Sequence, residues 1–184
     1  MAGRRSSLRV ATGELRGRRL KVPNGVRPTT DRVRAAMFDA LQQEPPARVL
    51  DLFAGSGSLG IEAYSRGSEF ILFVERSRSA AKVIKENLES LEIDTQADIL
   101  IRDVFRADLR GAGPFGLVFA DPPYADDPWA GVFEGITVSG VLARDARIIV
   151  EVSSRQGVPE APGGWVCWKT RRHGDSEFAI FVRE

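Results

Sequence analysis

Short apolar runs alternate with segments of helical periodicity through most of this chain. The runs are rich in β-branched and aromatic residues, as buried strands are, and cover residues 49–53, 69–75, 97–103, 116–121 and 147–152. Helical spacing is clear over residues 80–91 and weaker over residues 129–142. Strands that alternate with helices build a parallel, doubly wound α/β sheet, which binds its ligand at the carboxyl ends of the strands.

The N-terminal part of the chain follows a different pattern. Residues 1–7 are basic and polar, which is typical of a tail. Residues 8–22 alternate loosely and are broken by glycines, which predicts a short, bent hairpin. Thr29 or Thr30 is placed to cap a helix, and this helix must end before the prolines at residues 45–46.

The C-terminal part predicts an antiparallel hairpin. Residues 166–171 and 178–182 are strand-like and flank a short stretch rich in turn-forming residues. We therefore divide the chain into a basic tail and β-hairpin over residues 1–25 and an α/β domain over residues 26–184.

Charge is distributed unevenly, although the net charge is only +1. Residues 1–34 have a balance of +8, whereas residues 35–184 have a balance of −7. A basic segment of this kind suits a polyanion, although it also serves as an ordinary solvated surface. The candidates for phosphate contact are Arg9, Arg16, Arg18, Arg19 and Lys21.

The number of cysteines and the length of the apolar runs indicate the cellular location of the protein. A single cysteine forms no internal disulfide, and no apolar run reaches the length of a membrane span. These features predict a cytoplasmic protein that does not bind a membrane. The one histidine has no cysteine or histidine cluster to join, so we expect no metal site.

A glycine turn follows the first predicted strand. Gly55, Gly57 and Gly60 let the backbone turn sharply, and the free N–H groups of the next helix then point at the ligand. With Glu75 at a suitable distance, this spacing also fits a dinucleotide site. Asp51, just before the turn, would repel a pyrophosphate and suits a cationic amino-acid group. It is equally compatible with a carboxylate that caps the turn.

The tetrapeptide of residues 121–124, Asp-Pro-Pro-Tyr, is the more specific motif. Prolines fix φ and remove N–H donors, so the Asp121 carboxylate and the Pro122 carbonyl can both accept hydrogen bonds from one small donor. Tyr124 adds a flat face beside them. Two acceptors and a ring suit an exocyclic amine on a planar base, whereas in isolation the motif would be only a stiff turn.

These motifs together resemble class I S-adenosylmethionine-dependent methyltransferases that act on amines. In more detail the chain is similar to the RsmD family of bacterial 16S rRNA guanine-N2 methyltransferases, from Leu8 to Phe181. The matching segments are LRVATGELRGRRLKV, RPTTDRVRAAMFDAL, DLFAGSGSLGIEA, SRG, DPPY and RHGDSEFAIF, together with Glu75 and Asp103. The resemblance implies a Rossmann-like sheet of order 3-2-1-4-5-7-6 with strand 7 antiparallel and an N-terminal β-hairpin.

The resemblance also implies roles for individual residues. It implies that Asp121, Pro122 and Tyr124 are catalytic and that Pro123 and Tyr124, with the basic residues of the hairpin, bind the substrate. The implied S-adenosylmethionine contacts are Arg27, Thr29, Thr30, Asp51, Phe53, Gly55, Ser56, Gly57, Glu75, Asp103 and Val104. The reaction would release S-adenosylhomocysteine without a metal. The implied partner of this monomer is 16S rRNA, free or within the small subunit or its assembly intermediate.

Two alternatives remain open at this point. The target amine could instead be adenine N6 or a protein glutamine, although the basic hairpin and Asp121 favour guanine in RNA. A nicotinamide-dependent oxidoreductase would explain the glycine turn and Glu75, but it leaves Asp51 and the Asp-Pro-Pro-Tyr motif without a role.

Overall fold

The computed structural model describes residues 8–25, 29–42, 44–122 and 128–184. Its centre is a seven-stranded sheet of order β3-β2-β1-β4-β5-β7-β6. The strands are β1 Arg48–Leu52, β2 Phe70–Val74, β3 Ala97–Leu100, β4 Phe115–Ala120, β5 Leu142–Ser153, β6 Trp165–His173 and β7 Ser176–Arg183. Strands β1 to β5 are parallel, and β7 is antiparallel to both of its neighbours. The predicted order and the antiparallel seventh strand are confirmed.

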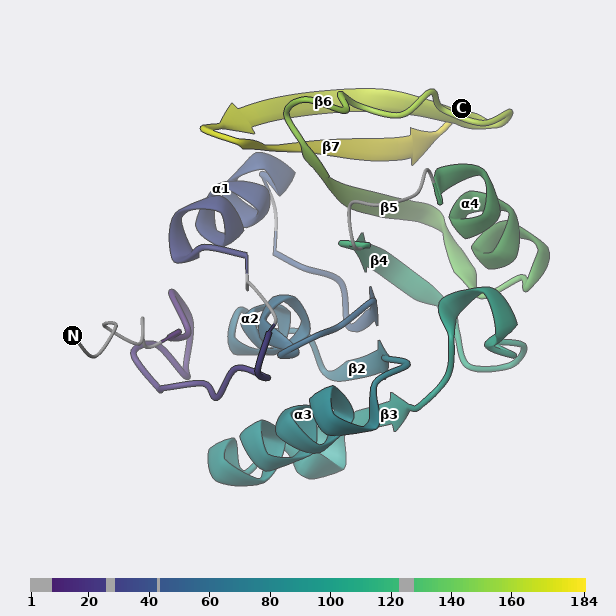
Figure 1. Cartoon of the computed structure of the whole chain (residues 1–184). Coiled ribbons are helices and arrows are strands. Elements are labelled where there is room, and N and C mark those ends of the chain that lie inside the picture. Colours follow the sequence, from purple (N-terminus) through teal and green to yellow (C-terminus); the bar gives the residue numbers. More distant parts are fainter. Residues whose placement is uncertain (1–7, 26–28, 43, 123–127) are drawn as a thin grey trace.

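Helices cover both faces of this sheet. They are α1 Asp31–Leu41, α2 Ser58–Ser65, α3 Arg78–Leu91 and α4 Trp129–Val138, with short 3-10 turns η1 Asp94–Gln96 and η2 Val104–Arg106. Helices α1, α2 and α3 lie on one face, and α4 lies on the other (Figure 1). None of the helices in the described ranges is long and apolar enough to span a membrane.

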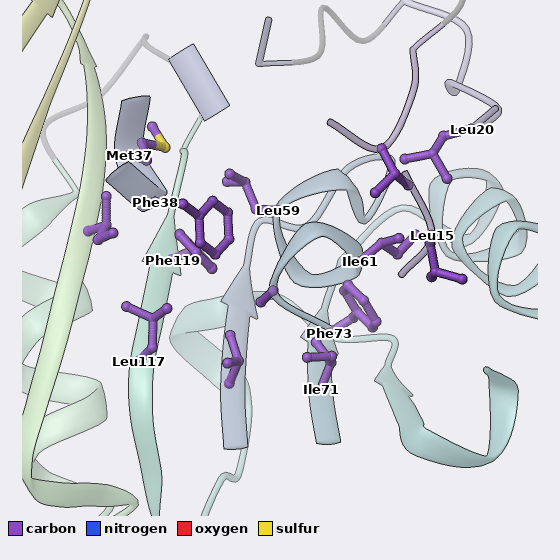
Figure 2. Close-up of a cluster of buried hydrophobic side chains, with 14 of the residues drawn as sticks. Leu15, Leu20, Met37, Phe38, Leu59, Ile61, Ile71, Phe73, Leu117 and Phe119 are labelled. Carbon is purple, nitrogen blue, oxygen red and sulfur yellow. The ribbon is translucent and has the colours of Figure 1, made fainter. Parts of the chain in front are cut away.

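The central strands β1, β2 and β4 read as nearly continuous apolar runs because both of their faces are buried. Neighbouring strand residues point to opposite faces, so Val49 joins the core beneath α1 to α3, whereas Leu50 joins the core beneath α4. Figure 2 shows the first of these two cores, in which the ring centroids of Phe38 on α1 and Phe119 on β4 lie 5.4 Å apart. The sheet is thus held from both sides, and its carboxyl edge is fixed in space.

Residues 8–25 form a bridged turn that packs on the body of the protein. Arg9 and Arg19 form an isolated antiparallel bridge, and the Leu20 N–H donates to the Leu8 carbonyl at 2.8 Å. Its apolar side chains, Leu8, Val10, Leu15 and Leu20, are buried in the core shared with α2 and α3. Figure 2 shows Leu15 and Leu20 in this core. The hairpin therefore consists of a single bridge rather than two full strands, and the division of the chain at residue 25 stays a prediction.

Three element boundaries differ clearly from the sequence prediction. Strand β5 begins at Leu142 rather than at residue 147, because Leu142 already pairs with Phe115 of β4 ahead of a register shift. Helix α4 ends at Val138 rather than at residue 142, because Gly140 adopts a left-handed φ of 67° and the chain enters β5 at Leu142. The third strand ends at Leu100 rather than at residue 103, because the Asp103 side chain begins η2 instead of extending the strand.

Candidate active site

The turn between β1 and α2 is sharply bent, as its glycines predict. Gly55 and Gly57 have φ values of 56° and 75°, which L residues with side chains rarely adopt. Phe53 also has a positive φ, 57°, without being glycine. Strained backbone of this kind is common where a chain passes close to a ligand. Ser56 is buried in this turn, and its carbonyl accepts a hydrogen bond from Asn87 Nδ2 at 3.1 Å.

Asp51 lies buried at the end of β1. Its Oδ2 accepts a hydrogen bond from the Gly60 N–H of α2 at 2.9 Å. Burial raises the pKa of this carboxyl to about 8, the Gly60 hydrogen bond lowers it in part, and the charge of Glu75 raises it further. The structure therefore shows the turn contact and also a desolvated carboxyl that a cation would stabilise as the anion.

Glu75 follows β2 at the same level of the sheet. One carboxylate oxygen accepts from the Gly55 N–H at 2.9 Å, and the other accepts from the Ser77 N–H at 2.7 Å. These bonds hold the carboxylate against the glycine turn. A carboxylate oxygen has more than one lone pair, so each retains acceptor capacity for a hydroxyl group of a ligand.

The next strand end contributes Asp103 and Val104. Asp103 caps η2 by accepting from the Phe105 N–H at 3.0 Å, and Val104 packs on the core beneath α4. Phe105 is 55% exposed and meets the Phe53 ring edge to face, with centroids 6.1 Å apart. This aromatic pair was not predicted, and its signal in the sequence is a phenylalanine two residues after Asp103.

Asp121 and Glu151 are neighbours across β4 and β5. They follow Ala120 and Val150, which are paired in the parallel register. The Thr29 hydroxyl lies between them, 3.2 Å from Asp121 Oδ2 and 2.9 Å from Glu151 Oε2. Burial raises the pKa of Asp121 well above its usual value. The charges of Glu151 and Asp51 raise that pKa further, and the Thr29 hydrogen bond opposes the rise.

Sequence reasoning missed Glu151. Its signal is an acid inside the apolar run of residues 147–152, but strand register was needed to place it beside Asp121. Of the other predicted residues, Thr30 caps α1 by accepting from the Val33 N–H at 3.3 Å, and Pro122 is buried. The remaining predicted site residues, Arg27, Pro123 and Tyr124, lie outside the described residues.

The site as a whole is an acidic receptor at the carboxyl edge of the sheet. Asp51 and Glu151 lie in β1 and β5, Glu75 and Asp121 directly follow β2 and β4, and all four are buried or partly buried. Among the described residues no cluster of His, Cys, Asp or Glu has the arrangement of a metal site. Closely spaced carboxylates in a dry environment favour a ligand with positive charge. Carboxylate oxygens also suit ligand hydroxyls, so this donor set fits S-adenosylmethionine, which carries cationic groups and a ribose.

The basic residues of the N-terminal segment differ in how far they are engaged. Arg9 donates to the Gly17 carbonyl at 2.7 Å, Arg18 donates to the Ser90 carbonyl at 2.6 Å, and Lys21 pairs with Glu86 at 2.7 Å. Arg16 and Arg19 are exposed, and their guanidinium groups show no hydrogen bond or ion pair within the described part of the chain. These two guanidinium groups are therefore open to an external anion.

Relatives and solved structures agree with this architecture. The chain is 36% identical over 183 residues to the putative rRNA methyltransferase YlbH of Bacillus subtilis, and the match covers 96% of this chain and 99% of that protein. It is 33% identical over 180 residues to the ribosomal RNA small subunit methyltransferase D of Escherichia coli, with 96% and 90% covered. The solved structure of the putative methyltransferase YhhF from E. coli superposes with a TM-score of 0.84 at 32% identity, covering 97% and 98%.

The strand order, the glycine turn and the acids at the strand ends define a class I methyltransferase fold. The family model described as "Conserved hypothetical protein 95" matches residues 8–182, and the chain belongs to this family. The resemblance to the small-subunit methyltransferases D is thereby confirmed. A more distant RNA methyltransferase from Salinibacter ruber, solved with S-adenosylhomocysteine, shares the fold with a TM-score of 0.64 at 15% identity.

Proposed function

We propose that this protein transfers a methyl group from S-adenosylmethionine to the exocyclic N2 amine of a guanine in bacterial 16S rRNA. The observation that carries the proposal is the set of buried or partly buried acids at the carboxyl ends of β1, β2 and β4, on a chain that belongs to this family. The names of its relatives, an rRNA methyltransferase and a small-subunit methyltransferase D, support RNA as the substrate.

The cofactor would bind over the glycine turn. Asp51 would face its cationic methionine group, Glu75 would accept from its ribose hydroxyls, and Asp103 with Val104 would flank the adenine. When bound, S-adenosylmethionine supplies an electrophilic methyl group. The desolvation that raises the pKa of Asp51 also strengthens its attraction to a cation.

The target base would bind where β4 ends. The Asp121 carboxylate and the Pro122 carbonyl would accept the two hydrogens of the amine, and Tyr124 would stack on the base. An exocyclic amine is a poor nucleophile because its lone pair is delocalised into the ring. Holding both hydrogens favours a pyramidal nitrogen and returns the lone pair for attack on the methyl carbon.

The RNA backbone would bind the basic N-terminal segment, because residues 35–184 carry net −7 and repel a polyanion. Arg16 and Arg19 are the phosphate contacts that the structure favours, because they are exposed and the other three candidates are engaged within the protein. The N-terminal extension, residues 1–25, would then serve binding, and residues 26–184 would serve transfer.

Radiolabelled methyl transfer tests the reaction and its product together. Purified protein is incubated with labelled S-adenosylmethionine and with 16S rRNA or small subunits from a strain that lacks its own methyltransferase D. The digested RNA is then analysed by mass. We expect label in N2-methylguanosine and little or no transfer by Asp121→Ala. Label in adenosine, label in protein or no transfer by the wild-type enzyme would refute the proposal.

Titration calorimetry tests the cofactor site. Glu75→Ala should weaken S-adenosylmethionine binding by about 1.5–3 kcal/mol, which is the value of hydrogen bonds to a charged group. Glu69→Ala is a matched control, because Glu69 is exposed at the other end of the same strand. Unchanged affinity in Glu75→Ala removes this residue from the site. Binding of NAD in place of S-adenosylmethionine would favour an oxidoreductase.

Salt dependence tests the RNA surface. The double variant Arg16→Glu and Arg19→Glu should lower the slope of log affinity against log salt by roughly one unit per lost phosphate contact. The control is Arg110→Glu with Arg144→Glu, because both residues are exposed and lie outside the N-terminal segment, Arg110 before β4 and Arg144 near the amino end of β5. An unchanged slope in the first variant would mean that the RNA surface lies elsewhere.

A further inference from the structure

Thr29 joins two carboxylates that belong to adjacent strands. Its hydroxyl lies 2.9 Å from Glu151 Oε2 and 3.2 Å from Asp121 Oδ2. Thr29 and Glu151 are 7% and 4% exposed, so the contact between them is closed to bulk water, whereas Asp121 is partly buried. A hydroxyl has one proton and two lone pairs, and it can therefore donate to one carboxylate while it accepts from the other group once that group is protonated.

The described groups that face this pair come from three neighbouring elements. Asp51 approaches from β1 and adds a further acid, and Phe178, the β7 residue paired with Glu151, is apolar. From α1, the buried Arg34 guanidinium donates to the Thr29 carbonyl at 3.5 Å, but its Nε is directed to Glu62 at 3.2 Å. Two neighbouring carboxylates hold a proton more tightly than one alone.

We propose that Glu151 is a positioning residue that acts through the Thr29 hydroxyl on Asp121, so that the two carboxylates together take up the proton that the target amine releases. This inference rests on the proposed function, because it assigns the proton acceptor of that reaction. It gives a role to a buried acid that binding of the cofactor and the base does not require.

The transfer generates this proton. The amine nitrogen forms a bond to the methyl carbon, the carbon–sulfur bond breaks, and its electron pair stays on sulfur. The nitrogen then carries a positive charge until one N–H bond breaks. Asp121 receives that proton, the Thr29 hydroxyl receives it from Asp121, and the original hydroxyl proton passes to Glu151. Charge and atoms balance, because the site gains one proton and the amine becomes neutral.

The single-turnover rate of methyl transfer as a function of pH tests this arrangement. Glu151→Gln keeps the size and hydrogen-bonding capacity of the side chain but accepts no proton. We expect its plateau rate to fall about tenfold or more, as for loss of proton transfer. We also expect the acidic limb to move to lower pH, because Asp121 loses a like-charged neighbour. A structural role alone would not move that limb.

Further variants keep the test decisive if the first one folds poorly. Glu151→Asp retains the charge, so its acidic limb should stay at the wild-type pH. Thr29→Val should slow transfer about tenfold, and Thr29→Ser should recover most of that loss, because serine restores the hydroxyl. Asp145→Asn, at an exposed position of the same strand β5, should leave both rate and limb unchanged.

Two failures can be told apart by this experiment. Absence of methyl transfer by the wild-type enzyme would refute the proposed function itself. If the wild-type enzyme transfers methyl groups while Glu151→Gln has the same rate within twofold and the same acidic limb, the role of Glu151 is refuted and the proposed function stands.

Discussion

Replacing Glu62 by Gln is expected to weaken the attachment of the N-terminal segment and the stability of the whole protein. The Glu62 side chain is fully buried in α2 and accepts four hydrogen bonds. One oxygen accepts from the Ala11 N–H at 2.8 Å and from Arg34 Nε at 3.2 Å. The other accepts from the Thr12 N–H at 3.0 Å and from Arg66 Nε at 3.0 Å.

The magnitude follows from this donor set. Gln has one oxygen and one NH2 group, so in either orientation the NH2 group faces two donors that lose their acceptor. Hydrogen bonds to a charged group contribute about 1.5–3 kcal/mol each, which gives roughly 3–6 kcal/mol for two. Removing one partner of a buried ion pair costs a similar amount, about 3–5 kcal/mol. That loss is a large share of the roughly 5–15 kcal/mol by which a typical domain is stable.

Urea unfolding measures this loss, and hydrogen exchange locates it. We expect a lower midpoint in Glu62→Gln and faster exchange at the amides of Ala11 and Thr12. Glu89→Gln is the control, because Glu89 is about half exposed and its pair with Lys85, at 3.7 Å, contributes little. A free energy of unfolding within 1 kcal/mol of wild type would show that this reasoning about the buried Arg34 and Glu62 pair is wrong.

Three further results are expected. Burial raises the pKa of Asp51 from 3.8 to about 8, so the contribution of this carboxyl to the free energy of unfolding falls as pH rises through that window. Because the cationic methionine group would bind the ionised carboxylate, S-adenosylmethionine affinity should rise by up to about tenfold per pH unit between about pH 6 and pH 7.5. Calorimetry should show that Asp51→Asn flattens this rise. Gly60→Ala should cost about 1–3 kcal/mol in urea unfolding, because its Cβ would lie 2.5 Å from Phe73 Cε1. Gly135→Ala, in open space on α4, should instead be neutral or stabilising. Phe105→Ala should weaken adenine nucleoside binding by about 1–3 kcal/mol in a competition assay, whereas unchanged affinity would exclude stacking.

The centre of the sheet was predictable from the sequence because β1, β2 and β4 are buried on both faces. These strands read as nearly continuous apolar runs, and acids mark their ends at Asp51, Glu75 and Asp121. The turn at Gly55 and Gly57 was equally clear, since its positive φ values require residues that tolerate them.

Contacts between distant segments were not predictable in this way. The pairing of Glu151 with Asp121 depends on the register of β4 and β5, and the buried Arg34 depends on Glu62, 28 positions away. The arginines of the hairpin were treated as equivalent, yet Arg18 is held by the Ser90 carbonyl. Local patterns show which faces are apolar, but they do not show which polar groups meet when the elements pack.

The position of β7 between β5 and β6 determines which strands form the two edges of the sheet. The outermost strands are β3, only four residues long, and β6, which contains Lys169, Arg171 and Arg172. Short edges and charged edges both disfavour strand addition by another molecule. The long apolar strands lie inside, where no second copy reaches their backbone. The same connectivity that places Phe178 beside the site thus protects the protein from aggregation through its edges.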